Sequence, residues 1–296
     1  MEYETLVDEI QNYVTQNLHR QITVQEVATA FGYSPRHLDR IFVHYTGRTL
    51  SKHIRLMRLT DAAKQLAADG EHNVLDVALN HEFDSHEGFT KAFKSAFGIS
   101  PKVYRKGNTP IQYFVPYPVR AQQIFERGMN EMDFTTRTVT AQVVERPQRT
   151  LIYLPSKEGN DYWAFCQEMG CEWEGLLNSI AAKYDTAAFI TFGQQMQPKE
   201  FPGGAAAIEV PADYAGSIPN GYHTMQLPAC KMLYFVGQPY ADEEDFPAAI
   251  TEVFNAYESY NPAQFGLAFD DSIAPSFNFG SYAESGARIA FAVKEL

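Results

Sequence analysis

The sequence predicts an all-α N-terminal domain followed by an α+β C-terminal domain. A helical pattern occurs twice within the first 100 residues, and near Thr136 the chain changes to segments that alternate between strand and helix patterns. The 296 residues are enough for two separate cores, and 45% hydrophobic with 20% charged residues is typical of globular proteins. We therefore expect two domains with a short connecting segment.

The repeated pattern covers residues 23–47 (TVQEVATAFGYSPRHLDRIFVHYTG) and residues 73–98 (NVLDVALNHEFDSHEGFTKAFKSAFG). Similar residues recur at an offset of 50 before the central turn and at 51 after it, so the second copy has one extra residue in that turn. The matched pairs are Val24/Val74, Val27/Val77, Ala28/Ala78, Tyr33/Phe83, Leu38/Phe89, Arg40/Lys91, Phe42/Phe93 and Gly47/Gly98.

Each copy is predicted to form a helix-turn-helix unit. Both helices of the first copy and the second helix of the second copy carry apolar residues at i, i+3, i+4 and i+7, which gives one buried stripe per helix. Gly32 can adopt the positive φ of a tight turn, and Ser34 followed by Pro35 is a typical helix start. In the second copy Asp84 or Ser85 is the expected helix cap.

The outer faces of the two second helices carry side chains suited to DNA. They hold Arg36, Asp39, Arg40 and Val43 in the first copy and Glu87, Thr90, Lys91 and Lys94 in the second. Arginine pairs with guanine, glutamate can accept from cytosine, and threonine can contact a thymine methyl group. Residues 50–68 form one longer predicted helix, which could hold the two second helices about one DNA turn (~34 Å) apart and let a monomer cover both half-sites.

The charge distribution agrees with this interpretation. Residues 1–110 contain 13 basic and 13 acidic side chains, whereas residues 111–296 contain 11 basic and 23 acidic ones and account for the whole net charge of −12. The basic residues of the first part cluster in residues 36–64 and 91–106. Local basic patches of this kind can contact phosphates on a chain that is acidic overall.

Residues 6–106 resemble the DNA-binding domain of AraC/XylS-family regulators, most closely in FTKAFKSAFGISPKVYR (residues 89–105). The resemblance implies that double-stranded DNA is a partner. It also implies the base-reading positions, which are Arg36, Asp39, Arg40, His86, Glu87, Thr90 and Lys91. One departure is Glu82, where the family usually has glycine; if this position needs positive φ, glutamate costs roughly 1 kcal/mol or more.

The second half is predicted to contain strands at residues 140–146, 149–155, 187–194, 204–214, 224–240 (two strands with a turn) and 286–296, with helices at 168–184 and 242–260. It resembles GyrI-like effector-binding domains in VVERPQRTLIYLP, LPACKMLYFVGQPY and RIAFAVK. This resemblance implies a pseudo-twofold pair of βαββ units around a central cleft. We expect a DNA-binding domain at residues 1–107, a connecting segment at 108–135 and a GyrI-like domain at 136–296.

Aromatic residues of the second half are the candidates for a ligand site, although each could equally belong to the core. The candidate ligand-binding residues are Tyr162, Trp163, Trp173, Tyr234, Phe277 and Asn278. Many relatives place a glutamate in the segment equivalent to SFNFGSY to bind a cation. Here Asn278 occupies that position, which favours a neutral aromatic or apolar effector.

Other functions have little support. No apolar run approaches the ~18 residues of a membrane span, and the N-terminus lacks a secretory pattern, so we expect a cytoplasmic protein. Three cysteines without metal-ligand spacing, no phosphate-binding glycine loop and a lone second-half His223 predict no metal, no cofactor and no enzyme.

The sequence thus predicts a transcription regulator controlled by a small molecule, with RNA polymerase as a further candidate partner. Two alternatives stay open. One is a fused hydrolase, for which Trp173-Glu174 is the only supporting pair. The other is a ligand-independent DNA-binding protein whose second domain contacts other proteins.

Overall fold

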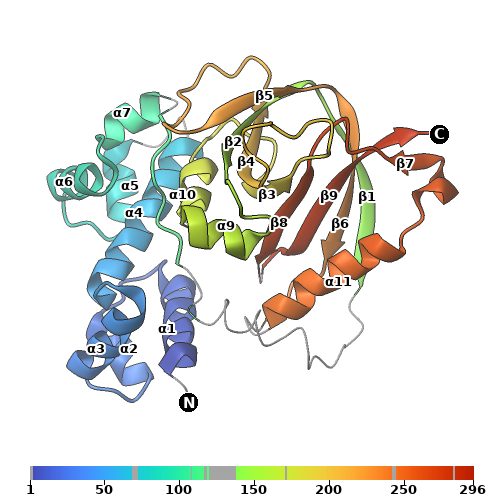
Figure 1. Cartoon of the computed structure of the whole chain (residues 1–296). Coiled ribbons are helices and arrows are strands. Elements are labelled where there is room, and N and C mark those ends of the chain that lie inside the picture. Colours follow the sequence, from blue (N-terminus) through green and yellow to red (C-terminus); the bar gives the residue numbers. More distant parts are fainter. Residues whose placement is uncertain are drawn as a thin grey trace. The chain divides into compact units, whose positions relative to one another are not determined.

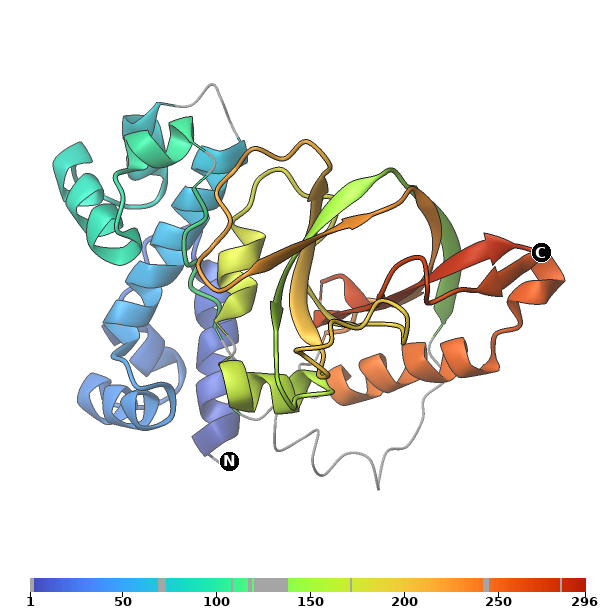
Figure 2. The same ribbon diagram turned by 45° about the horizontal axis from the view of Figure 1, so that its top comes forward.

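The computed structural model describes residues 3–68, 73–107, 109–116, 119, 138–170, 172–241, 245–282 and 284–296. The chain divides into two compact units, Met1–Arg120 and Ala121–Leu296, and each is described by itself (Figures 1 and 2). The predicted connecting segment is residues 108–135, and most of it falls in the stretch 120–137, which lies outside the described residues. Among the described helices, none has the length and apolar character of a membrane span.

The first unit is helical, as predicted. Its helices are α1 (Tyr3–Asn17), α2 (Val24–Ala30), α3 (Pro35–Thr46), α4 (Leu50–Ala68), α5 (Val74–Asn80), α6 (His86–Phe97) and α7 (Pro101–Lys106). The two helix-turn-helix units are α2–α3 and α5–α6, and α4 has the bounds that the sequence predicted.

Local capping explains where these helices begin and end. The hydroxyl of Ser34 accepts from the amide of His37 at the start of α3, and Ser85 caps α6 in the same way by accepting from Gly88. Both second helices end at a glycine with positive φ, Gly47 and Gly98.

Two apolar cores lie in the helical unit, and α4 contributes to both. Its N-terminal half packs with α1, α2 and α3 through residues such as Ile54, while its C-terminal half packs with α5, α6 and α7 through residues such as Leu66. Residues after α7 also join these cores: Ile111 and Tyr113 are buried, and the amide of Phe114 donates to the hydroxyl of Thr60 on α4 at 2.9 Å.

His53 of α4 is buried in an apolar part of the first core. Its ring lies edge-on to Phe42 and Phe114, with ring centroids 5.1 and 5.0 Å away, and neither ring nitrogen has a hydrogen-bond partner. Burial, reinforced by the charge of Arg48, lowers the pKa of His53 to about 4.

The second unit is an antiparallel sheet with helices on one face. Its strands are β1 (Val139–Arg146), β2 (Arg149–Pro155), β3 (Ala188–Thr191), β4 (Ala205–Pro211), β5 (His223–Leu227), β6 (Cys230–Gly237), β7 (Leu267–Phe269), β8 (Ser276–Tyr282) and β9 (Gly286–Glu295). The strand order is β1-β6-β9-β8-β3-β4-β2-β5, and β7 pairs with β9.

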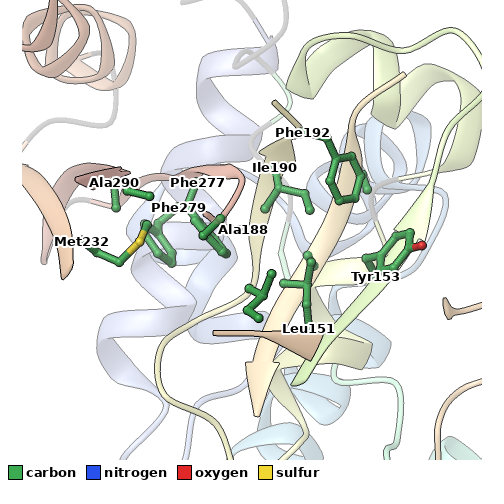
Figure 3. Close-up of a cluster of buried hydrophobic side chains, with 14 of the residues drawn as sticks. Leu151, Tyr153, Ala188, Ile190, Phe192, Met232, Phe277, Phe279 and Ala290 are labelled. Atoms are coloured by element: carbon green, nitrogen blue, oxygen red, sulfur yellow. The ribbon is translucent and has the colours of Figure 1, made fainter. Parts of the chain in front are cut away.

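The two faces of this sheet bury different clusters. One face forms a single core with residues from β2 to β9, including Leu151, Met232 and Phe277 (Figure 3). The opposite face is covered by α9 (Tyr162–Met169) and α10 (Trp173–Asn178) over one half and by α11 (Phe246–Ser259) over the other. The helical N-terminal and α+β C-terminal layout predicted from the sequence is therefore confirmed.

Some predicted elements differ. The single helix expected at residues 168–184 is wrong: α9 ends at Gly170, whose φ of 80° favours glycine, and the short α10 follows. No strand was predicted at the positions of β7 and β8. In β8 the pairing register with β9 shifts between Asn278 and Ser281, where the strand has an irregularity.

The burial of His53 predicts a pH-dependent loss of stability. The folded protein keeps this ring neutral down to about pH 4, whereas the unfolded chain takes up the proton near its ordinary value of 6.5. The free energy of unfolding should therefore fall by about 1.4 kcal/mol per pH unit as the pH drops from 6.5 towards 4. Urea unfolding followed by far-UV circular dichroism at pH 7, 6 and 5 measures this slope. His53→Leu should show a shallower slope, and equal slopes would contradict the assignment.

Candidate nucleic-acid interface and small-molecule site

The first helix-turn-helix unit presents two arginines to solvent. Arg36 and Arg40 on α3 are exposed, and a guanidinium nitrogen of Arg40 lies 3.1 Å from Nδ1 of His37. Because α3 begins at the capped Ser34–Pro35 step, both arginines lie within its first two turns. Their donors can form the paired hydrogen bonds that guanine accepts.

Asp39 has a contact within the unit that the sequence did not predict. Its Oδ1 accepts a hydrogen bond of 2.8 Å from the amide of Leu50, the first residue of α4. The side chain is half-buried, unlike its neighbours Arg36 and Arg40. One carboxylate oxygen of Asp39 is thus occupied inside the protein.

The second helix-turn-helix unit exposes His86, Glu87 and Lys91 along α6. His86 and Glu87 lie in the first turn of the helix, and Lys91 follows one turn later. Thr90 differs from them, because its hydroxyl oxygen is buried and has no hydrogen-bond partner. The face therefore offers a cation, a carboxylate and an imidazole to an approaching ligand.

The turns of the two units require the same backbone conformation. Gly32 has a φ of 74°, and Glu82 at the matching position has a φ of 61°. Among the described residues, Glu82 is the only one other than glycine with positive φ. The expected departure at Glu82 is therefore real, and the second unit carries local backbone strain that the first does not.

In the C-terminal sheet domain, a carboxyl group on the helix-covered face is bound by two tyrosines. The hydroxyl of Tyr162 donates to Oε1 of Glu174 at 2.8 Å, and that of Tyr282 donates to Oε2 at 3.2 Å. Burial raises the pKa of Glu174, and the two hydrogen bonds oppose this rise only in part. The ring of Trp163 lies edge-on to that of Tyr162, with centroids 5.1 Å apart.

The six candidate ligand residues do not form one cluster. Tyr162 bonds to Glu174 and packs against Trp163, and Trp173, the first residue of α10, is buried with 4% of its surface exposed. Tyr234 and Phe277 lie on the other face of the sheet, in the continuous core. Both are therefore core residues, which is the alternative that the sequence left open for each aromatic candidate.

Tyr234 also belongs to a buried ionic network. A guanidinium nitrogen of Arg146 donates to its hydroxyl oxygen at 2.6 Å, and Arg146 and Arg288 both pair with Asp185, at 3.3 and 2.9 Å. Behind them the fully buried Arg149 pairs with Glu209. These contacts join residues of β1, β2, β4, β6 and β9.

Asn278 makes a local contact. Its side-chain oxygen accepts from the amide of Gly280 at 2.9 Å, within the irregular part of β8. Glu174 and Tyr282 were not among the predicted ligand residues, since the 108 positions between them hide their contact in the sequence. The pair Trp173-Glu174, which supported only the hydrolase alternative, was the available signal. The described residues contain no group of three or more metal-ligating side chains.

Comparisons with known proteins match the helical part of the chain. A family model described as a helix-turn-helix domain matches residues 27–107. The transcriptional activator AarP of Providencia stuartii is 36% identical over 105 residues, 36% of this chain and 77% of AarP. The right origin-binding protein of Escherichia coli K12 is 31% identical over 136 residues, 46% of either chain, so less than half of that relative is matched.

A solved DNA-binding domain of AdpA in complex with a target DNA has 27% sequence identity and a TM-score of 0.31, covering 34% of this chain and 89% of that one. The paired helix-turn-helix units and the matching relatives define a DNA-binding transcription regulator. Within this class the chain belongs to the AraC/XylS family.

The strained turn gives a testable prediction. Glu82→Gly should raise the free energy of unfolding by roughly 1 kcal/mol, because glycine adopts positive φ without the Cβ clash. Gly32→Ala at the matching turn should lower it by a similar amount, although no atom lies within 4 Å of the added Cβ. Urea unfolding measures both, and a destabilised Glu82→Gly would show that Glu82 has a compensating contact.

Proposed function

We propose that this chain binds specific DNA sequences through α3 and α6 and that a small molecule bound in the C-terminal domain controls this binding. The carrying observation is that both second helices expose polar side chains on the face away from the core. The domain assignment is the one expected above: residues 1–107, 108–135 and 136–296. The proposal places the protein with its DNA in the cytoplasm, and RNA polymerase contact would be a further consequence of effector binding.

The proposed base contacts are Arg36 and Arg40 from α3 and His86, Glu87, Thr90 and Lys91 from α6. The exposed members can reach base edges directly, whereas Thr90 would have to turn its buried hydroxyl outward. Asp39 was also in the predicted set, but its Oδ1 already accepts from the amide of Leu50. The charge distribution supports the same surface, since the negative net charge belongs to residues 111–296.

The strand order supports a GyrI-like pair of βαββ units in the second domain. Along the chain, β2, α9–α10, β3 and β4 follow one another, and β6, α11, β8 and β9 have the same order with the short β7 between α11 and β8. In the sheet, β6-β9-β8 on one side corresponds to β2-β4-β3 on the other. The outermost strands are exchanged, because β1 pairs with β6 and β5 pairs with β2.

The proposed effector site is built around Glu174. A carboxyl group between two tyrosine hydroxyls, with the ring of Trp163 packed against that of Tyr162, suits a ligand with an aromatic body and a cationic group. This revises the neutral effector favoured by Asn278, since Glu174 supplies a carboxyl from a different element. Because the pKa of Glu174 is raised, cation binding should release a proton and strengthen as the pH rises through that pKa.

Arg40→Ala tests the DNA contact. If Arg40 makes a paired contact to guanine, specific affinity should fall by ~1–3 kcal/mol, with a smaller loss on random DNA. Arg40→Lys keeps the charge but not the planar pair of donors, and it should restore only the non-specific part. Fluorescence anisotropy on a site obtained by in vitro selection measures both. Equal losses on specific and random DNA would assign Arg40 to phosphate contact.

Glu174→Gln tests the effector site. Tetraphenylphosphonium should raise the melting temperature of the wild type more than neutral triphenylphosphine oxide does, because only the cation gains from the carboxylate. Glu174→Gln should abolish this difference and leave the effect of the neutral compound unchanged. Equal responses of wild type and variant would remove Glu174 from the site. Hydrolysis of a bound ester probe, lost in the same variant, would favour the hydrolase alternative.

A further inference from the structure

The second helix of each helix-turn-helix unit, α3 or α6, packs against the helix that follows it, α4 or α7, and the contact between them differs in the two units. The second halves of the two repeats are related by an offset of 51 residues. At this offset Asp39 corresponds to Thr90, Thr49 to Ser100 and Leu50 to Pro101. Leu50 begins α4 and Pro101 begins α7, so the repeat compares the same junction in both units.

In the first unit this junction contains a charged hydrogen bond. Oδ1 of Asp39 accepts from the amide of Leu50 at 2.8 Å. An amide in the first turn of a helix has no partner within that helix, and the positive end of the helix dipole favours a carboxylate there. The bond therefore connects the middle of α3 directly to the start of α4, eleven residues further along the chain.

In the second unit the same bond cannot form. Pro101 has no amide hydrogen, and the hydroxyl oxygen of Thr90 is buried without a hydrogen-bond partner. The cap of α7 is satisfied separately, because the hydroxyl of Ser100 accepts from the amide of Val103 at 3.3 Å. The position of α6 over α7 thus depends on apolar packing around Phe93 and Tyr104.

We propose that Asp39 is a positioning residue that fixes the orientation of α3 on α4, and that base reading by α3 belongs to Arg36 and Arg40. The second helix lacks this bond and is held less rigidly. This inference rests on the proposed function, in which α3 and α6 contact the bases. The inference gives Asp39 a structural role in place of the predicted base contact, because its side chain bonds to the backbone of Leu50.

The experiment compares Asp39→Ala, Asp39→Asn and Thr90→Val in the full chain. Asp39→Ala should speed amide hydrogen exchange at Leu50 about tenfold or more, as expected for loss of a hydrogen bond to a charged group. It should weaken binding to every single-base variant of the selected site by a similar factor and leave the order of base preference unchanged. Asp39→Asn keeps an acceptor oxygen and should restore most of both properties, while Thr90→Val in the second helix-turn-helix unit should leave the exchange at Leu50 unchanged.

Two outcomes would overturn the proposal. One is a changed base preference at a single position with normal exchange at Leu50, which would make Asp39 a base reader. The other is no change in exchange or binding. Failure of the proposed function appears separately, as an Arg40→Ala variant without loss of specific binding.

The second unit provides a gain-of-contact control that does not depend on the folding of Asp39→Ala. Thr90→Asp combined with Pro101→Ala should recreate the bond, so that the double variant protects the amide at position 101 and resists urea more than the two single changes predict together. Strictly additive effects with an unprotected amide would count against the role assigned to the junction.

Discussion

The DNA-binding surface depends on one helix that belongs to two cores. Within its 19 residues, α4 buries Leu50, Ile54 and Met57 in the first core and Leu59 and Leu66 in the second. Packed interiors have few alternative arrangements, so neither helix-turn-helix unit can rotate freely about this helix. The spacing between α3 and α6 is therefore a property of α4 and of the side chains packed along it. A polar or proline substitution within α4 would disturb both units together.

The helical unit could be predicted nearly element by element because its determinants are local. Ser34, Ser85, Gly47 and Gly98 act within a few residues of the helix ends that they define, and the apolar stripes repeat in two copies. The sheet was harder to predict. Its strands pair with partners far along the chain, and the register of β8 on β9 shifts near Gly280, which has positive φ. The break between α9 and α10 lies in a segment that is apolar enough for one continuous helix.

The same distinction applies to the candidate sites. The exposure of Arg40 and Lys91 follows from helical periodicity, so these faces could be predicted from the sequence. The contacts of Asp39 with Leu50 and of Glu174 with Tyr282 could not, because spacing along the chain does not reveal which side chains meet in space. The split of the aromatic candidates between two faces of the sheet likewise depends on the register of β6 and β8.

The differences between the two helix-turn-helix units all act in one direction. The first has glycine at its turn and a charged hydrogen bond at its exit, whereas the second has Glu82 at positive φ and the unpaired hydroxyl of Thr90. Each feature lowers the local stability of the second unit relative to the first. Local opening should therefore concentrate in α5 and α6. A ligand that binds only the closed form, as DNA does in the proposed function, removes a larger population of open form from the unit that opens more easily, although the free energy of stabilisation is the same for both units.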